Sequence, residues 1–114
     1  MVKIDTARGM EYSMNDRDMY RDMALMFCEQ HEQNAGQIKS EFQNKDWANY
    51  KIHVHGLKSN SRLVGGTELG DLAEKCEHAA RDGQEDVLNA ETETLLNLYA
   101  ETVKALQSLD FDSL

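Results

Sequence analysis

The sequence contains no proline, few cysteines and no long apolar run. Its 114 residues include only two cysteines, Cys28 and Cys76, which is too few for a disulfide framework and fits a reducing compartment. No apolar run approaches the roughly 20 residues that a membrane span requires. The N-terminus lacks the apolar stretch of a signal peptide. We therefore expect a cytoplasmic chain, either free or as the cytosolic part of something larger.

Basic residues are also scarce. Twelve Lys and Arg against twenty-one Asp and Glu give a net charge of −9. Such a surface repels nucleic-acid phosphates and anionic lipid, so we expect neither nucleic-acid binding nor direct membrane contact. The hydrophobic fraction of 40% supports one core, and no repeat or linker interrupts the chain. The sequence therefore predicts a single domain over residues 1–114.

The lack of proline favours long helices, because an interior proline breaks them. Apolar residues at helical spacing predict helices over about residues 6–10, 16–33, 37–44, 47–64, 67–82 and 85–109. Asn15 and Asp46 are the expected N-caps of two of them, and Gly65 and Gly83 the expected ends of two others. Short connections favour antiparallel neighbours. The prediction is all-α: an antiparallel up-down four-helix bundle with an extra short N-terminal helix.

Several residues suggest chemistry that packing explains better. Cys28 and His31 are three positions apart, and a small metal-binding bundle could be built from them together with Cys76. Both cysteines fall near apolar stripes, where free cysteine behaves as a small hydrophobe, so no metal site is expected. Three methionines are likewise expected to fill the core: Met19, Met23 and Met26. No Gly-x-x-x-x-Gly-Lys phosphate loop is present, which excludes an autonomous kinase.

The helix expected after Asp46 carries a histidine on its solvent side. Its buried seam, spaced three and four positions apart, is formed by Trp47, Tyr50, Val54, Leu57, Ser61 and Val64. At about 100° per residue, His55 points more than about 90° away from the centre of this seam. Lys58, Ser59 and Arg62 follow on the next turns. His53 points to another side, and, like His31 and His78, is given no chemistry.

The surroundings of His55 suit transfer of a phosphoryl group. The side chain of a histidine titrates near neutrality, so a neutral, nucleophilic ring is available at physiological pH. Phosphoryl transfer depends mostly on positioning and charge neutralisation, which Lys58 and Arg62 could supply. Gly56 and Ser59 keep the helix surface low around His55. On geometry alone, an ordinary exposed histidine remains the simpler interpretation.

The segment His55-Gly56-Leu57-Lys58-Ser59, followed by Gly65, resembles the motif of histidine-containing phosphotransfer (HPt) domains. That motif reads His-x-Leu-Lys-Gly/Ser and is followed by a glycine. The next helix of the family is matched by Leu69, Leu72 and Glu77, and residues 16–27 resemble its leading helix. The resemblance covers about residues 4–106. It departs at Ser59, where glycine is commonest, and at Arg62, which is bulkier than the usual residue.

The resemblance implies a four-helix bundle that is a phosphorelay intermediate, not an enzyme in its own right. His55 would accept a phosphoryl group from a receiver-domain aspartate or a sensor kinase and pass it to a response regulator, with electrostatic assistance from Lys58. The expected receiver-docking face consists of Gly56, Ser59, Arg62, Gly65, Ile52 and Leu63.

The partners implied are response-regulator receiver domains and a hybrid sensor histidine kinase, of whose cytosolic part this chain could be a piece. No cofactor is expected, because magnesium would be held by the receiver domain, and the chain is expected to be a monomer. The open alternative is a helical-bundle interaction module that binds a receiver domain or another partner and is never phosphorylated.

Overall fold

The structure is a computed structural model that describes residues 2–114. These residues form six α-helices and no strand: α1 Thr6–Tyr12, α2 Arg17–Glu29, α3 His31–Gln43, α4 Trp47–Leu63, α5 Thr67–Arg81 and α6 Glu85–Gln107. A short 3-10 helix, η1 (Phe111–Ser113), follows α6. The prediction of an all-α fold is confirmed, and the expected short N-terminal helix is α1.

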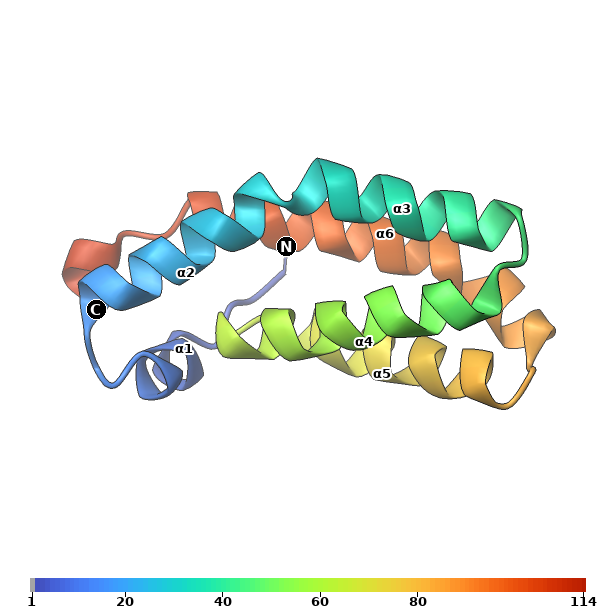
Figure 1. The fold of residues 1–114 in the computed structure, drawn as a ribbon. Helices are drawn as coiled ribbons and strands as arrows, with labels where there is room; N and C mark the ends of the chain where they lie inside the picture. The colour runs from blue at the N-terminus through green and yellow to red at the C-terminus, as the bar shows by residue number, and fades with distance from the viewer. Residues whose placement is uncertain (1) are drawn as a thin grey trace.

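The helices lie along the length of a molecule that measures 43 × 23 × 22 Å. Figure 1 shows α2 and α3 end to end above α6, and α4 and α5 side by side. The helix α1 lies at one end, where it contacts α2 and α4. Among residues 2–114, no helix has both the length and the apolar character needed to cross a membrane.

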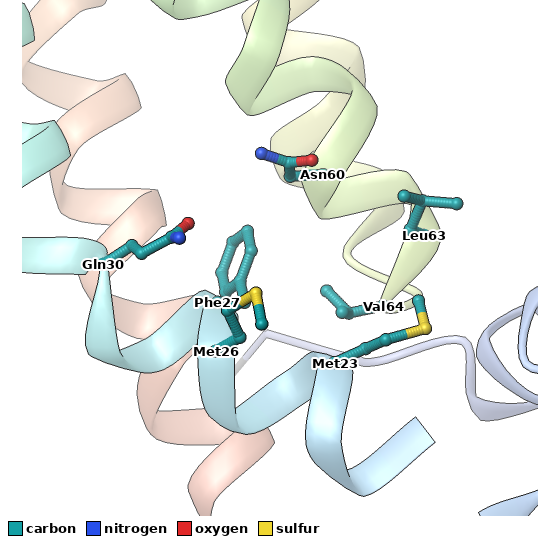
Figure 2. A pocket seen from close by; sticks show the side chains of 7 residues that line it. All are labelled: Met23, Met26, Phe27, Gln30, Asn60, Leu63 and Val64. Carbon is teal, nitrogen blue, oxygen red and sulfur yellow. The ribbon is translucent and has the colours of Figure 1, made fainter. Parts of the chain in front are cut away.

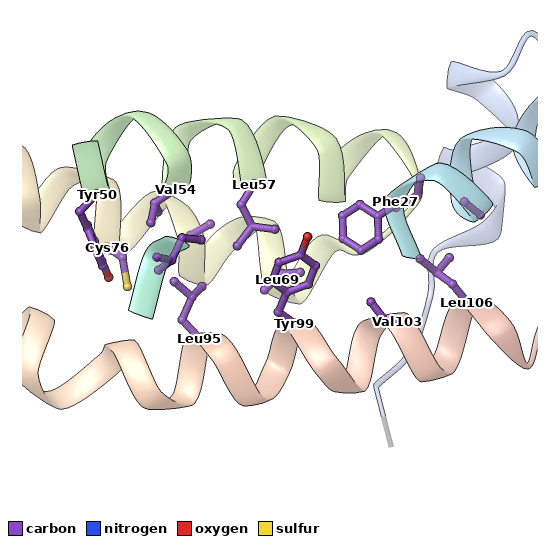
Figure 3. Packing of buried hydrophobic residues seen from close by; sticks show 14 of the residues in the cluster. Phe27, Tyr50, Val54, Leu57, Leu69, Cys76, Leu95, Tyr99, Val103 and Leu106 are labelled. Carbon is purple, nitrogen blue, oxygen red and sulfur yellow. The ribbon is translucent and has the colours of Figure 1, made fainter. Parts of the chain in front are cut away.

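The core lies where the long helices face one another (Figure 3). The predicted seam of α4 is confirmed, since Tyr50, Val54, Leu57 and Ser61 are all buried. The apolar side chains that meet it from the other helices include Phe27, Ile38, Leu69, Cys76, Leu95, Tyr99 and Leu106. Buried hydroxyls have partners, as between Tyr50 Oη and Thr92 Oγ1 at 2.8 Å. The packing of these buried residues therefore fixes which side of α4 faces solvent.

The α4–α5 pair is the most closely associated pair of helices in residues 2–114. Gly65 ends α4 with a φ of +84°, in the left-handed region that favours glycine. The carbonyl of Gly65 accepts a hydrogen bond from Asp5 N at 2.8 Å. Further along, the stem of Arg62 lies over Gly70, where an added Cβ would come within 2.7 Å of Arg62 Cγ. The missing side chain at Gly70 thus lets the Arg62 stem of α4 lie directly against α5.

The structure corrects the predicted start of α2. Asp16, not Asn15, is the N-cap, because its carboxylate accepts from Asp18 N and Met19 N at 3.0 and 3.2 Å. Asn15 lies in the preceding turn with a φ of +58°, a conformation that asparagine tolerates better than most residues.

Two further predictions about residues 17–43 were wrong. The interruption expected at residues 34–36 occurs at Gln30, between α2 and α3, and Gly36 lies inside α3. Met19 and Met26 are not core residues, since they are 43% and 59% exposed. The first error arises because no glycine or proline marks the break at Gln30, and the second because α2 turns part of its apolar surface toward solvent.

Candidate functional site

His55 lies in the middle of α4 on its exposed side. Its side chain is 59% exposed, whereas Val54 and Leu57 are buried against the core. The helix begins in the right register because the Asp46 side chain caps it, accepting from Asn49 N. The predicted orientation of His55 is confirmed. A ring so placed can be reached by a group on another protein.

Glu77 reaches His55 from the neighbouring helix α5. Its Oε2 lies 2.7 Å from His55 Nδ1, and its Oε1 lies 2.7 Å from Lys58 Nζ. The Glu77 and Lys58 side chains are each only 16% exposed. One carboxylate of α5 therefore holds both the imidazole and the ammonium of α4, from the side of the ring that faces the protein.

The charge of Glu77 fixes how the ring bonds. Burial by itself raises the pKa of Glu77, but the hydrogen bonds and charges of Lys58 and His55 outweigh burial and hold that pKa below its usual range. An ionised carboxylate can only accept hydrogen bonds. His55 Nδ1 must then carry the hydrogen and donate it, so in the neutral ring Nε2 is the nitrogen with the free lone pair.

The surface next to the ring is low, as the sequence suggested. Ser59 turns its hydroxyl back onto its own helix and donates to His55 O at 3.3 Å. A Cβ added at Gly56 would meet nothing within 4 Å, so the space above this residue is open. Ile52 and Leu63 are 60% and 38% exposed. We call the exposed side of α4 formed by Ile52, His55, Gly56, Ser59 and Leu63 the His55 face.

Two residues of the expected docking face are placed differently. Gly65 is buried, and a Cβ there would lie 2.3 Å from Asp5 O, so the expectation that it contributes to the docking surface was wrong. Its role is to end α4. Arg62 is turned toward α5, where its Nη2 lies 3.1 Å from Asp71 Oδ1 and 3.2 Å from Glu74 Oε2. Its cation is therefore already paired in this state.

The other histidines lie apart from this group. His53 Nδ1 lies 2.6 Å from Glu41 Oε2, which joins α4 to α3. His78 is exposed, and His31 packs edge-on against Tyr99, with 4.6 Å between ring centroids. Within residues 2–114, no three His, Cys, Asp or Glu side chains gather closely enough to hold a metal ion. Cys28, His31 and Cys76 accordingly do not form such a group in this part of the chain.

The contact that sequence reasoning missed is the one made by Glu77. The residue was matched to the family pattern, but no partner was assigned to it. His55 and Glu77 are 22 positions apart, and only the packing of α5 on α4 brings them together. The available signal was an acidic residue on the solvent-side edge of a helix expected to run antiparallel to α4.

A comparison with protein-family models gives a match to this chain. The family model of the Hpt domain matches residues 22–108, which includes the second part of α2 and all of α3 to α6. No curated protein and no solved structure matches the chain.

Proposed function

The chain belongs to the Hpt domain family, and we propose that within it His55 is the residue that carries the phosphoryl group. The family works in phosphorelays of two-component signal transduction, with histidine as the phosphorylated residue. The observation that carries the assignment is the 2.7 Å contact between His55 Nδ1 and Glu77 Oε2, because it leaves Nε2 as the nucleophile on an exposed ring.

The proposed step is the attack of His55 Nε2 on the phosphorus of a receiver-domain aspartyl phosphate. The N–P bond forms as the P–O bond to the aspartate breaks, and the electron pair of that bond leaves with the carboxylate. The phosphorylated ring keeps its hydrogen on Nδ1 and so carries a positive charge. Glu77 lies where it offsets this charge, since its carboxylate already accepts from Nδ1. The reverse step passes the phosphoryl group to the next aspartate.

Lys58 is proposed to assist electrostatically. Its ammonium lies one turn from His55 and is held by Glu77 Oε1 at 2.7 Å. From that position it can offset negative charge on the phosphoryl oxygens as they approach Nε2. Gly56 and Ser59 leave room for the partner, and Ile52 and Leu63 offer apolar contacts, as a recognition surface needs. Arg62 would contribute only if it left Asp71 and Glu74.

We propose a four-helix-bundle topology in which α2 and α3 together form one of the four rods. We further propose that the whole chain is one such domain, that it works in the cytoplasm, and that its partners are receiver domains and a hybrid sensor kinase. The catalytic acidic residues and magnesium are assigned to the receiver domain. The chain itself would act as a phosphotransfer intermediate and not as an autonomous enzyme.

The test uses a receiver domain labelled with radioactive acetyl phosphate as the donor. Label that is acid-labile and base-stable should appear on the wild-type chain within the mixing time of the assay. It should be absent from His55→Gln. His53→Gln and His78→Gln are matched controls, since they remove other imidazoles, and they should accept label as the wild type does. Label that persists on His55→Gln defeats the assignment.

The same assay separates the rival function. An interaction module that is never phosphorylated would bind the receiver domain but take no label from it, and its binding would be indifferent to His55→Gln. The rival function would therefore replace the proposed one if the chain bound labelled receiver domains stably but took no label from any of them.

A further inference from the structure

A shallow apolar groove runs between α2 and α4. It has a volume of about 260 Å³ and is lined by Met23, Met26, Phe27, Gln30, Asn60, Leu63 and Val64. Figure 2 shows Met23, Met26 and Phe27 on the α2 side, with Leu63 at the end of α4 and Val64 just after it on the opposite side. We call it the α2–α4 groove.

The α2–α4 groove is continuous with the His55 face. Leu63 belongs to both, because it lines the groove and follows His55 and Ser59 in a row of residues four positions apart. Ile52 is exposed on the same side of α4. A receiver domain that closes over His55 Nε2 must cover this side of α4 and so reach the rim of the groove. The occupant of the rim is thus the receiver domain.

Met23 and Met26 line the groove from α2, and Met19 lies one turn before Met23 on the same helix. Met19, Met23 and Met26 are four and three positions apart, so they share one side of α2. Met23 is partly buried, and its sulfur accepts from Ser13 Oγ at 3.6 Å. Met19 and Met26 are 43% and 59% exposed. An exposed thioether makes soft, adaptable protein contacts, and it is also a site of oxidation.

We propose that Met26, together with Met19 two turns earlier on the same side of α2, is an oxidisable contact of the receiver-docking surface, and that conversion to the sulfoxide slows phosphotransfer by weakening docking. This inference rests on the proposed function. The oxidant is hydrogen peroxide: its O–O bond breaks and one oxygen bonds to the thioether sulfur, which loses two electrons. The other oxygen leaves as water with both protons. The sulfoxide is polar, and covering it with an apolar partner surface is costly.

The cysteines do not offer peroxide an easier target. Cys76 is fully buried and Cys28 half-buried. Burial raises the pKa of both thiols, which lowers the fraction of the reactive thiolate. Oxidation should therefore begin at the exposed methionines.

The experiment oxidises this chain alone. The purified chain is treated with hydrogen peroxide, the excess is removed with catalase, and mass spectrometry of peptides measures the sulfoxide at each methionine. Transfer is then timed from a labelled receiver domain that the untreated chain accepts as donor. We expect oxidation to slow transfer at limiting receiver concentration by about tenfold. The Met19→Leu/Met26→Leu double variant should transfer at one rate before and after peroxide.

Met14→Leu is the matched control. Met14 is 83% exposed in the turn before α2, so it oxidises readily but lies outside the groove lining. After peroxide treatment, this variant should transfer as slowly as the treated wild type. Methionine sulfoxide reductase should restore the transfer rate of both. Full oxidation of Met19 and Met26 without a slower rate would overturn the inference, as would an equal loss in the double leucine variant. An untreated chain that takes no label would instead defeat the proposed function.

Discussion

The imidazole of His55 on α4 and the carboxylate of Glu77 on α5 meet at 2.7 Å. The ring is mostly exposed, whereas the carboxylate is mostly covered and is also held by Lys58. Because Glu77 of α5 accepts the hydrogen on Nδ1, the outward nitrogen Nε2 of the neutral ring keeps a free lone pair.

Replacing Glu77 by alanine should slow phosphotransfer without unfolding the chain. In the proposed mechanism, the variant removes the acceptor that keeps the hydrogen on Nδ1 and the charge that offsets the positive charge of the phosphorylated ring. We expect a loss of about tenfold to a hundredfold, as for other residues that orient a reacting imidazole. Glu77→Gln keeps an acceptor oxygen but not the charge and should fall in between. Single-turnover transfer kinetics measure it, with Glu74→Gln as the control on the same helix. A wild-type rate for Glu77→Ala would remove the residue from the mechanism.

The ion pair of Glu77 with Lys58 should stabilise the fold in a pH-dependent way. The pKa of Glu77 is depressed in the folded chain, against burial, by Lys58 and His55. Its stabilisation is therefore complete above the ordinary pKa of a glutamate, about 4.3, and is lost as the pH falls through the lower folded pKa. Urea unfolding of chains with and without Glu77→Gln, both in a His55→Gln background, should give a difference that shrinks toward low pH. A difference that grows there would contradict the assignment.

Lys58→Ala should slow transfer by about tenfold, because the cation no longer offsets charge on the phosphoryl oxygens. The midpoint of urea unfolding should also fall, since Lys58 forms an ion pair with the mostly covered Glu77 carboxylate, so transfer is timed without denaturant. Lys75→Ala is the matched control: Lys75 also pairs with a glutamate, with 3.0 Å between its Nζ and Glu91 Oε1, but away from His55. Equal rates for the two variants would show that Lys58 has no special part in transfer.

Gly56→Ala should make the chain more stable and yet slower in transfer. A Cβ at Gly56 or at Gly36 meets nothing within 4 Å, and both glycines lie inside helices. Alanine at either should add about 1 kcal/mol to the free energy of unfolding. Only the methyl group at Gly56 lies on the His55 face, so only that variant should transfer more slowly. Equal transfer rates in Gly56→Ala and Gly36→Ala would place the docking surface elsewhere.

Gly65→Ala should cost more stability than Gly83→Ala. Both glycines have positive φ, +84° and +68°, so each substitution should cost about 1 kcal/mol for the backbone conformation. At Gly65 the new Cβ would also lie 2.3 Å from Asp5 O, whereas at Gly83 it meets nothing within 4 Å. We expect at least about 2 kcal/mol at Gly65 from the two effects together. Chemical denaturation of both variants measures the difference.

The sequence predicted those features that depend on a single helix. The buried seam of α4 and the outward direction of His55 follow from one periodicity, and both were confirmed. The break near Gln30 was misplaced, because no glycine or proline marks it and Gly36, which looked like a break, is held in α3 by neighbouring packed residues. Local signals do not report how a neighbouring element supports a segment.

Features that depend on two helices were harder to predict. Arg62 was expected beside the reacting ring, but acidic residues of α5 hold it. Gly65 was expected on the docking face, but the N-terminal segment covers it. Glu77 acquires its partners only through the close approach of α4 and α5. Relative placement of helices is fixed by tertiary contacts that periodicity does not encode.

The close approach of α4 and α5, with Gly70 beneath the Arg62 stem, has a consequence for recognition. It brings Glu77 of α5 within 2.7 Å of His55 Nδ1, so a protein that approaches the ring meets a hydrogen-bonding state that is already set. Adaptation to different receiver domains would then come from another part of the contact surface, where the flexible methionine side chains of α2 can change conformation. In the proposed function, the same histidine chemistry would in this way serve more than one receiver domain.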